Sequence, residues 1–255
     1  MQMYKIHNEI ELAKKLMPPF PRTYHLGIEP NATDDDKVLS LEETMKFLEG
    51  NVVISEKVDG SNLAIRIING KPFVRNRNHV LRKGYTTRNT PAQQQYARVW
   101  SWLYEKTMDS KFFNYEKIMV ACDMCGDDIT IYGEWVYAQH TIGYDALPDL
   151  FIGFDIWSDS RNLFLDPDTT RHILTESGFA TPAVREWGKN LTVDRLKELR
   201  DMPSALSASG VQSEGIYLTQ GNGQRTVERF KMVGPHFKSD DTWNKKQLVK
   251  NQLAK

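Results

Sequence analysis

Two periods of hydrophobic residues follow one another along the chain, and they predict a helix before residue 50 and strands after it. In LEETMKFLEG (residues 41–50), Leu41, Met45 and Leu48 recur at helical spacing and share one face. Ser40 and Glu43 form a capping box at its start, and a glycine stands at its end. We therefore expect a capped amphipathic helix here. Residues 9–16 predict another helix, ahead of the proline-rich turn PPFPRTYHL (18–26).

A period of two begins after residue 50. NVVISEK (51–57) and NLAIRIING (62–70) read as strands, and Leu63, Ile65 and Ile67 point to one side of the second. Asn69 and Gly70 are a strong hairpin signal leading into KPFVRN (71–76). The run TPAQ (90–93) then starts a helix whose expected buried stripe is Tyr96, Val99, Trp100 and Leu103.

The remaining pattern alternates strands with surface helices. We expect strands over 129–136, 150–157, 214–220 and 225–233, and helices over 168–178 and 192–200. The fold class is therefore α+β, with mainly antiparallel sheets flanked by helices. Without repeats or a low-complexity linker, residues 1–255 read as one domain. Its core spans about 37–238, an extension spans 1–36, and a tail spans 239–255, which the pattern predicts as helical and positively charged.

Composition and charge fit a water-soluble protein with a local basic groove. Hydrophobic residues make up 40% and charged residues 26% of the chain, and 33 basic residues balance 33 acidic ones. We see no apolar run long enough for a membrane span and no leader, so we expect a cytoplasmic protein. The zero net charge disfavours a nucleic-acid coat protein. Basic residues still cluster at Arg75, Arg77, Arg82, Lys83 and Arg88, and acidic ones at Asp34, Asp35 and Asp36.

The two cysteines, Cys122 and Cys125, stand in the run ACDMCG. A structural zinc site needs a second pair of ligands, which this chain lacks. The tryptophan and proline of a thioredoxin-like redox site are missing as well. We expect two reduced, half-buried thiols.

The chemistry is concentrated in SEKVDGSN (55–62), which joins two predicted strands. A single K-x-D-G is most often an ordinary hairpin corner. Here further motifs follow in order: VRNRN (74–78), YGEW (132–135), GFDIW (153–157), SEGIYL (213–218) and ERFKMV (228–233). This ordered set resembles the covalent nucleotidyltransferase superfamily of DNA ligases, RNA ligases and mRNA capping enzymes.

The flanking segments narrow the resemblance to stand-alone ATP-dependent RNA ligases. PRTYHL (21–26) and the aromatic loop within GEWVYAQHTIGYDALPDLFIGFDIW (133–157) are similar to segments of that group. The resemblance implies a ligase adenylation domain, an ATP-grasp-like nucleotidyltransferase fold. It also implies that AMP from ATP becomes bonded to Lys57. Arg22 and His25 of PRTYHL either face the nucleotide or brace the lysine strand, and we favour bracing.

Attack on ATP requires Lys57 to lose a proton, although an unperturbed lysine has a pKa of about 10.4. Carboxylates alone would raise this pKa, whereas a divalent metal and nearby cations would lower it. We expect Asp59, Glu134 and Glu214 to hold a hydrated Mg²⁺, or Mn²⁺, mostly through water. The resemblance implies that Glu134 also contacts the ribose.

Several further residues are expected at the nucleotide. Gly60 allows a close approach because it has no Cβ, and Asn62 offers an amide donor. The resemblance adds Glu56 and assigns Arg77 to the nucleotide and to the RNA 5′-phosphate, with Arg75 or Arg82 as alternatives. Phe154 should stack on the adenine while Asp155 faces away, and Phe151 is the aromatic neighbour that could be confused with it.

The last motif has arginine where the superfamily most often has lysine. Arg229 and Lys231 stand two residues apart, so on a strand they share a face and could meet the same phosphate. Lys231 would stabilise the charge that develops on the α-phosphate.

The expected function is an ATP-dependent RNA ligase that joins 5′-phosphate and 3′-hydroxyl ends, nicked or single-stranded, through lysyl-AMP and adenylylated RNA. Partner enzymes would be an end-healing kinase and phosphatase. A DNA ligase or a capping guanylyltransferase is an alternative, but both normally append an oligonucleotide-binding barrel, and residues 234–255 are too few for one. A catalytically inactive nucleotide- or RNA-binding module is the alternative of another class.

Overall fold

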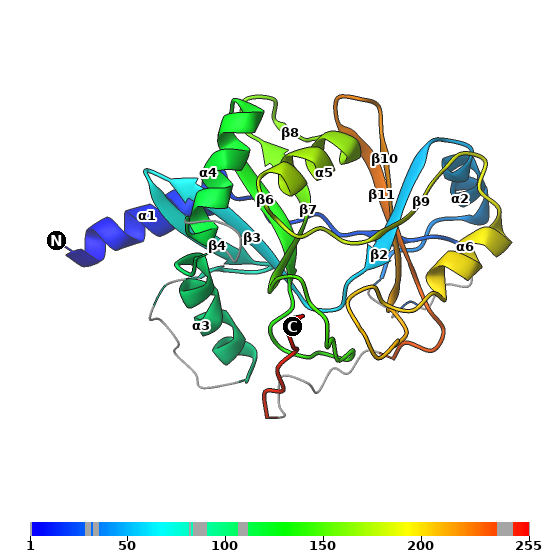
Figure 1. The fold of residues 1–255 in the computed structure, drawn as a ribbon. Helices are drawn as coiled ribbons and strands as arrows, with labels where there is room; N and C mark the ends of the chain where they lie inside the picture. Colours follow the sequence, from blue (N-terminus) through cyan, green and yellow to red (C-terminus); the bar gives the residue numbers. More distant parts are fainter. Residues whose placement is uncertain are drawn as a thin grey trace.

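The structure is a computed structural model, and it describes residues 2–28, 32, 36–81, 83, 91–106, 112–238 and 247–254. Over these residues the chain forms two sheets with helices packed around them (Figure 1). Every named strand pair is antiparallel except β1 with β11. The expected α+β class with mainly antiparallel sheets is confirmed.

The five-stranded sheet has the order β1 (Tyr24–His25), β11 (Thr226–Val233), β10 (Gly215–Gly221), β2 (Val52–Lys57), β9 (Val184–Gly188). The six-stranded sheet has the order β5 (Val80–Leu81), β4 (Lys71–Asn76), β3 (Ser61–Ile68), β6 (Ile129–Trp135), β7 (Phe151–Ser158), β8 (Leu163–Phe164). The helices are α1 (Gln2–Leu16), α2 (Leu41–Leu48), α3 (Pro91–Leu103), α4 (Asn114–Cys125), α5 (Pro167–Glu176) and α6 (Val193–Arg200).

The connection from β2 to β3 decides where the chemistry lies. These strands are neighbours in sequence but belong to different sheets, so the K-x-D-G segment crosses from one sheet to the other. It is therefore no hairpin corner. The predicted hairpin is the next one: Asn69 and Gly70 have φ values of 50° and 72°, and they join β3 to β4 as the Asn-Gly pair indicates.

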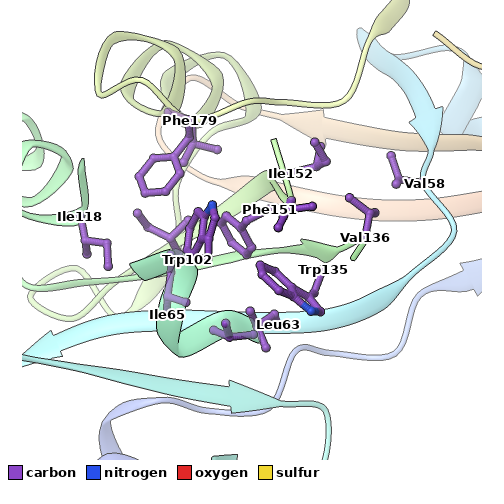
Figure 2. Packing of buried hydrophobic residues seen from close by; sticks show 14 of the residues in the cluster. Val58, Leu63, Ile65, Trp102, Ile118, Trp135, Val136, Phe151, Ile152 and Phe179 are labelled. Carbon is purple, nitrogen blue, oxygen red and sulfur yellow. The ribbon is translucent and has the colours of Figure 1, made fainter. Parts of the chain in front are cut away.

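The larger core lies on the helix-covered side of the six-stranded sheet. Trp102 of α3 packs against Trp135 of β6 and Phe151 of β7, with ring centroids 5.7 Å apart in both pairs (Figure 2). Ile118 of α4 and Phe179, which follows α5, belong to the same cluster. This packing holds the strand that carries Glu134 against helices on one side, which leaves the other side to face the cleft.

A second core joins α2 and α6 to the outer face of the five-stranded sheet (Figure 1). The capping box of α2 is confirmed, but its predicted apolar face is wrong. Leu48 is buried, whereas Leu41 and Met45 are 60% and 45% exposed. The buried side is rotated toward Phe47, whose ring lies edge-on to Phe230 at 4.6 Å, because that aromatic contact buries more apolar surface.

The stripe predicted for α3 is partly correct. Val99 and Leu103 are buried, while Tyr96 and Trp100 are only half-buried. Trp102 takes the central position instead, and its Nε1 donates to Asp149 Oδ1 at 2.6 Å. Thr90, the predicted cap of this helix, lies outside the described residues.

Helix α4 was missed from the sequence because its apolar residues surround the helix: Ile118 and Ala121 are buried, but Met119 and Met124 are exposed. It carries both cysteines, which are free thiols, Cys122 half-buried and Cys125 buried. Strands β1, β5, β8 and β9 are short and were missed as well.

The described part of the C-terminal tail differs from its prediction, while residues 239–246 and 255 of the predicted helical tail lie outside the described residues. Residues 247–254 form no helix but run extended, with Lys250 bridged to Ala138 and Leu253 to Leu147. The tail's backbone groups find partners in another segment, so they do not need the partners that a helix would provide. None of the helices in the described part of the chain has the length and apolar character to cross a membrane.

Candidate active site

A cleft of about 800 Å³ opens between the two sheets. Its size is that of a small-molecule site, for which volumes of roughly 300–1,000 Å³ are usual. Strands of both sheets contribute to its lining, together with the K-x-D-G crossing. The structure thus brings nearly all the predicted site residues to one cavity: Glu56, Lys57, Asp59, Gly60, Asn62, Arg77, Glu134, Phe154, Glu214 and Lys231.

Lys57 is the last residue of β2, and its Nζ lies 2.6 Å from Glu214 Oε2. Because Lys57 pairs across the sheet with Gly215, the residue before β10 is brought beside the lysine. The lysine side chain is 25% exposed and that of Glu214 is 9% exposed. The amine is therefore buried in the cleft and held by a carboxylate rather than free in solvent.

Three carboxylates surround this single amine. Burial alone lowers the pKa of Lys57, but Glu214, Glu134 and Asp59 together outweigh it and raise the pKa, as expected for carboxylates without a metal. Burial likewise raises the pKa of Glu134 to about 8 and that of Glu214 to about 7, against the attraction of Lys57. Glu134 therefore tends to keep its proton near pH 7, and additional positive charge in the pocket would favour the ionised carboxylates.

Asp59 is held by the loop that follows β6. Its Oδ2 accepts from the backbone amides of Thr141 and Ile142, both at 2.8 Å, and its own amide donates to the Tyr144 hydroxyl at 2.8 Å. One carboxylate oxygen is therefore already committed to the protein.

The predicted metal ligands do not form a direct coordination shell. Among the described residues, no three His, Cys, Asp or Glu side chains lie close enough together to hold an ion. Glu134 nevertheless fits contact with a hydrated cation, because its half-buried carboxylate lines the cleft beside Lys57. Binding through water, as expected from the sequence, stays a prediction.

Lys231 lies on the same sheet as Lys57, with β10 between their strands, and its Nζ is 2.9 Å from Asp36 Oδ1. The other oxygen of Asp36 lies 3.4 Å from His25 Nε2. Burial, and then the charge of Lys231, lower the pKa of His25 to about 4, so this histidine is neutral near pH 7. The Asp36 carboxylate is therefore the ion-pair partner of Lys231 in the structure.

The segment PRTYHL was expected to brace the lysine strand β2, and this is wrong in detail. Its strand β1 pairs with β11 at the edge of the sheet, with His25 opposite Lys231. It therefore braces the strand that carries Lys231. Arg22 and His25 also line the cleft.

Arg229 does not share a target with Lys231, although both lie on one face of β11. Its Nη2 is 3.2 Å from Asp155 Oδ2, and its guanidinium lies 4.3 Å from the centre of the Phe164 ring. The side chain therefore bridges β11 in one sheet and β7 in the other. Arg229 is thus the positive partner of the buried Asp155, and the expectation that both cations meet one phosphate stays a prediction.

The two aromatic candidates on β7 are separated by burial. Phe154 is half-buried, lines the cleft and lies 5.2 Å from Phe20 in an edge-on arrangement. Phe151 is fully buried in the core (Figure 2). Phe154 is thus available for stacking, and Phe151 is not.

The other residues predicted to bind the nucleotide are Glu56, Gly60 and Asn62, and they differ in their contacts within the protein. The carboxylate of Glu56 is 1% exposed and accepts from the Ala205 amide at 2.9 Å, which ties β2 to another loop. A Cβ on Gly60 would lie 2.7 Å from the Trp135 carbonyl, so the close approach that requires glycine is that of β6. Asn62 lies opposite Glu134 in the sheet register.

The arginines of the basic cluster differ in their contacts. Arg75 donates to the Met17 carbonyl at 3.0 Å and so fastens helix α1. Arg77 is exposed and lines the cleft, whereas Arg82 and Arg88 lie outside the described residues, as do Asp34 and Asp35. The geometry favours Arg77 over Arg75 as the cation that faces a ligand.

Sequence reasoning missed His140, which lines the cleft with its Nε2 3.3 Å from Ser61 Oγ. It also missed Tyr144 and Asn251, whose contacts with the same loop appear only in three dimensions. The aromatic run around residues 135–144 was a signal, although it did not indicate which side chains face the site.

Comparison with known proteins identifies one family model and several solved structures of similar fold. Residues 50–233 match the family model described as RNA ligase. Among solved structures, Naegleria gruberi RNA ligase with PPi has a TM-score of 0.55 and 17% identity, over 87% of this chain and 64% of that one. A variant of that ligase with ATP and Mn has a TM-score of 0.55 and 18% identity, over 92% and 67%.

These identities support likeness of fold. The chain spans 64% of the first of these structures. Among curated proteins, no significant match is found.

Proposed function

The chain belongs to the RNA ligase family, and on that premise we propose that it is an ATP-dependent RNA ligase that joins 5′-phosphate and 3′-hydroxyl ends. The observation that carries the proposal is the position of Lys57. A lysine amine in a cleft between two sheets, 2.6 Å from a carboxylate and with a second lysine lining the same cleft, is suited to covalent nucleotidyl transfer. The whole chain, 1–255, would act as one adenylation domain.

In the first step the Lys57 amine attacks the α-phosphorus of ATP. A nitrogen–phosphorus bond forms, pyrophosphate leaves, and the amine loses its proton. Glu214 lies close enough to accept that proton, and burial raises its pKa to about 7, which suits a general base near neutral pH. Lys231 would stabilise the charge that develops on the phosphate, and Phe154 would stack on the adenine.

In the second step an oxygen of an RNA 5′-phosphate attacks the same phosphorus, and Lys57 is released as the leaving group. In the third step a 3′-hydroxyl attacks the activated RNA phosphate, the phosphodiester bond forms, and AMP leaves. The exposed Arg77 is the cation best placed to orient the 5′-phosphate end.

We further propose that Asp59, Glu134 and Glu214 bind a divalent cation, Mg²⁺ or Mn²⁺, mostly through water. The excess of buried carboxylates over amines supports it, and so do the neighbouring ligase structures, which contain Mn together with ATP or AMP. A bound divalent cation supplies positive charge that lowers the pKa of a nearby amine and neutralises phosphate oxygens.

The cellular setting follows from the chemistry of the ends. RNA cleavage often leaves a 5′-hydroxyl and a phosphorylated 3′ end, so a kinase and a phosphatase would have to act before this enzyme. We propose RNA repair in the cytoplasm, with nicked or single-stranded RNA as substrate. Joining of DNA ends is the alternative.

The test is covalent labelling. The protein is incubated with Mg²⁺ and with ATP or GTP labelled at the α-phosphate, and the adduct is sought on a denaturing gel. We expect label from ATP, lost in Lys57→Ala and retained in Lys189→Ala, where the lysine is exposed and remote from the cleft. Label from GTP would instead indicate a capping enzyme, and no label at all would indicate an inactive binding module.

A ligation assay then separates RNA from DNA substrates. Nicked and single-stranded substrates with a 5′-phosphate are compared in RNA and DNA forms. We expect joining of RNA and an adenylylated RNA intermediate. Joining confined to DNA would overturn the RNA assignment but keep the adenylylation chemistry.

A further inference from the structure

Residues 247–254, here called the C-terminal strap, run beside residues 136–147, the loop that follows β6 (Figure 1). Backbone hydrogen bonds join the two segments repeatedly. Gln139 donates to the Val249 carbonyl at 2.9 Å, and Leu147 donates to the Gln252 carbonyl at 3.0 Å. In the other direction, the Gln252 amide donates to Tyr144 at 2.9 Å and the Ala254 amide to Leu147 at 2.8 Å. The strap is therefore fastened along the length of the loop.

One side chain of the strap reaches both arms of the loop. Asn251 is 8% exposed, and its Nδ2 donates to the Val136 carbonyl at 2.8 Å. Its Oδ1 accepts from the Tyr144 amide at 2.9 Å. The side-chain amide of Asn251 thus donates to one arm of the loop and accepts from the other, which holds the two arms together. The neighbouring side chains of Lys250 and Gln252 are exposed, and that of Lys250 contacts the loop only through the face of the Tyr137 ring, 5.6 Å from its Nζ, within the described residues.

The loop that Asn251 closes is in direct contact with the K-x-D-G segment. Its Thr141 and Ile142 amides bind the Asp59 carboxylate, and its Tyr144 hydroxyl accepts from the Asp59 amide. The same loop brings His140 to the cleft. Tyr144 is thus fixed by Asn251 through its backbone and holds Asp59 through its hydroxyl. A continuous chain of contacts runs from the strap to the residue two positions after Lys57.

From this geometry we infer that the C-terminal strap is part of the adenylation site, and that Asn251 is a positioning residue which holds the 136–147 loop in the shape that orients Asp59 and His140 beside Lys57. The inference rests on the proposed function, since it concerns the rate of Lys57 adenylylation. Asn251 does not face the cleft and takes no part in bond formation. Its effect is transmitted through Tyr144 and the Asp59 amide.

The first test compares Asn251→Ala with Gln252→Ala, a neighbour whose exposed side chain can be removed without touching the backbone bonds. Single-turnover labelling of Lys57 is measured against ATP concentration, well below the melting temperature of each variant. We expect Asn251→Ala to lower the maximal rate by about tenfold to a hundredfold, as small misplacements of catalytic groups do. The half-saturating ATP concentration should change by no more than about threefold, because the strap does not touch the nucleotide. Gln252→Ala should behave as the parent does.

A double-mutant cycle tests the route of the effect. Tyr144→Phe removes only the hydroxyl that binds the Asp59 amide. If Asn251 acts through Tyr144, adding Asn251→Ala to Tyr144→Phe should slow labelling far less than Asn251→Ala does in the parent. Independent effects that multiply would overturn the proposed route, because a general loss of stability would act equally in both backgrounds.

Hydrogen exchange provides a readout that needs no activity. In Asn251→Ala the amides of Thr141 and Ile142 should exchange faster than in the parent, while those of α6, on the far sheet, should not change. If the parent itself is not labelled by ATP, the proposed function fails, and faster exchange at these two amides would still support the coupling of strap and loop. Unchanged exchange, or a labelling rate within twofold of the parent, would overturn the inference.

Discussion

Two acidic side chains of the cleft, Glu134 and Asp36, lie beside the lysines that are expected to act on ATP. Glu134 belongs to a group of three carboxylates around one amine, and burial raises its pKa to about 8. Asp36 forms an ion pair with Lys231, the cation expected to bind a phosphate. Both residues are therefore poised to change partner when a charged ligand enters.

The first prediction concerns Glu134→Gln. A carboxyl whose pKa is raised on folding favours the folded state fully below its ordinary pKa of about 4.5 and loses this contribution as the pH rises through 8. Glutamine is neutral throughout. In metal-free buffer, the melting temperature of Glu134→Gln should exceed that of the parent by several degrees at pH 8.5, and the difference should shrink toward pH 5.

Thermal melts at both pH values, with a chelator present, measure this difference. Glu228→Gln removes one negative charge at an exposed strand position and serves as the control. A difference between Glu134→Gln and the parent that stayed constant from pH 5 to pH 8.5 would contradict the prediction.

The second prediction concerns Asp36→Asn. An incoming phosphate must replace Asp36 at Lys231, and a partly exposed ion pair of this kind contributes on the order of 0.5 kcal/mol. Removing the carboxylate should therefore tighten ATP binding by about threefold. Titration with ATP in a Lys57→Ala background measures binding without reaction. Asp123→Asn, an exposed site on α4, is the control; weaker binding by Asp36→Asn would count against a competing role.

At the scale of elements, the K-x-D-G crossing connects the two sheets and places Lys57 in the cleft. It carries Lys57 out of β2 and enters β3 beside β6, where Gly60 lies under the Trp135 carbonyl. The requirement for glycine at this position is therefore one of packing between neighbouring strands.

The third prediction is that Gly60→Ala destabilises the fold and slows adenylylation together. Its Cβ would lie 2.7 Å from the Trp135 carbonyl and 3.0 Å from Glu134 Cγ, so β6 or the crossing must shift. Overpacking of this kind costs about 1–3 kcal/mol. Urea unfolding and single-turnover labelling measure the two effects. A variant as stable and as fast as the parent would indicate that the crossing has room to move.

At the scale of the whole molecule, the Arg229–Asp155 pair is one of the polar contacts that join the two sheets. Asp155 is 2% exposed, and burial, opposed by Arg229, raises its pKa to about 6. The pair therefore contributes to the relation between the two walls of the cleft.

The fourth prediction is that Arg229→Met destabilises the protein by about 3 kcal/mol at pH 8, because it leaves a buried carboxylate without a partner. The loss should be smaller at pH 5, where Asp155 is largely protonated in the folded state and needs no cation. Adding Asp155→Asn should recover much of the stability at pH 8. Urea unfolding at both pH values measures this, and equal losses at the two would argue against the ion pair.

Much of the site was readable from the sequence because its signals are local. The Asn69-Gly70 turn and the capping box at Ser40 depend on a few consecutive residues, and their conformations are decided by backbone sterics and short hydrogen bonds. The ordered motifs likewise indicated that Lys57, Glu134 and Glu214 would meet, and the structure brings them to one cleft.

Long-range contacts decided the rest. Arg229 and Lys231 share a strand face in any antiparallel sheet, but only the approach of β7 turns Arg229 toward Asp155. Residues 247–254 have a helical pattern, yet the open backbone groups of the 136–147 loop draw them into an extended strap. Periodicity specifies which side of a segment is apolar. Which partner covers that side, or satisfies its backbone, depends on residues far away in the sequence, and only the tertiary structure brings them together.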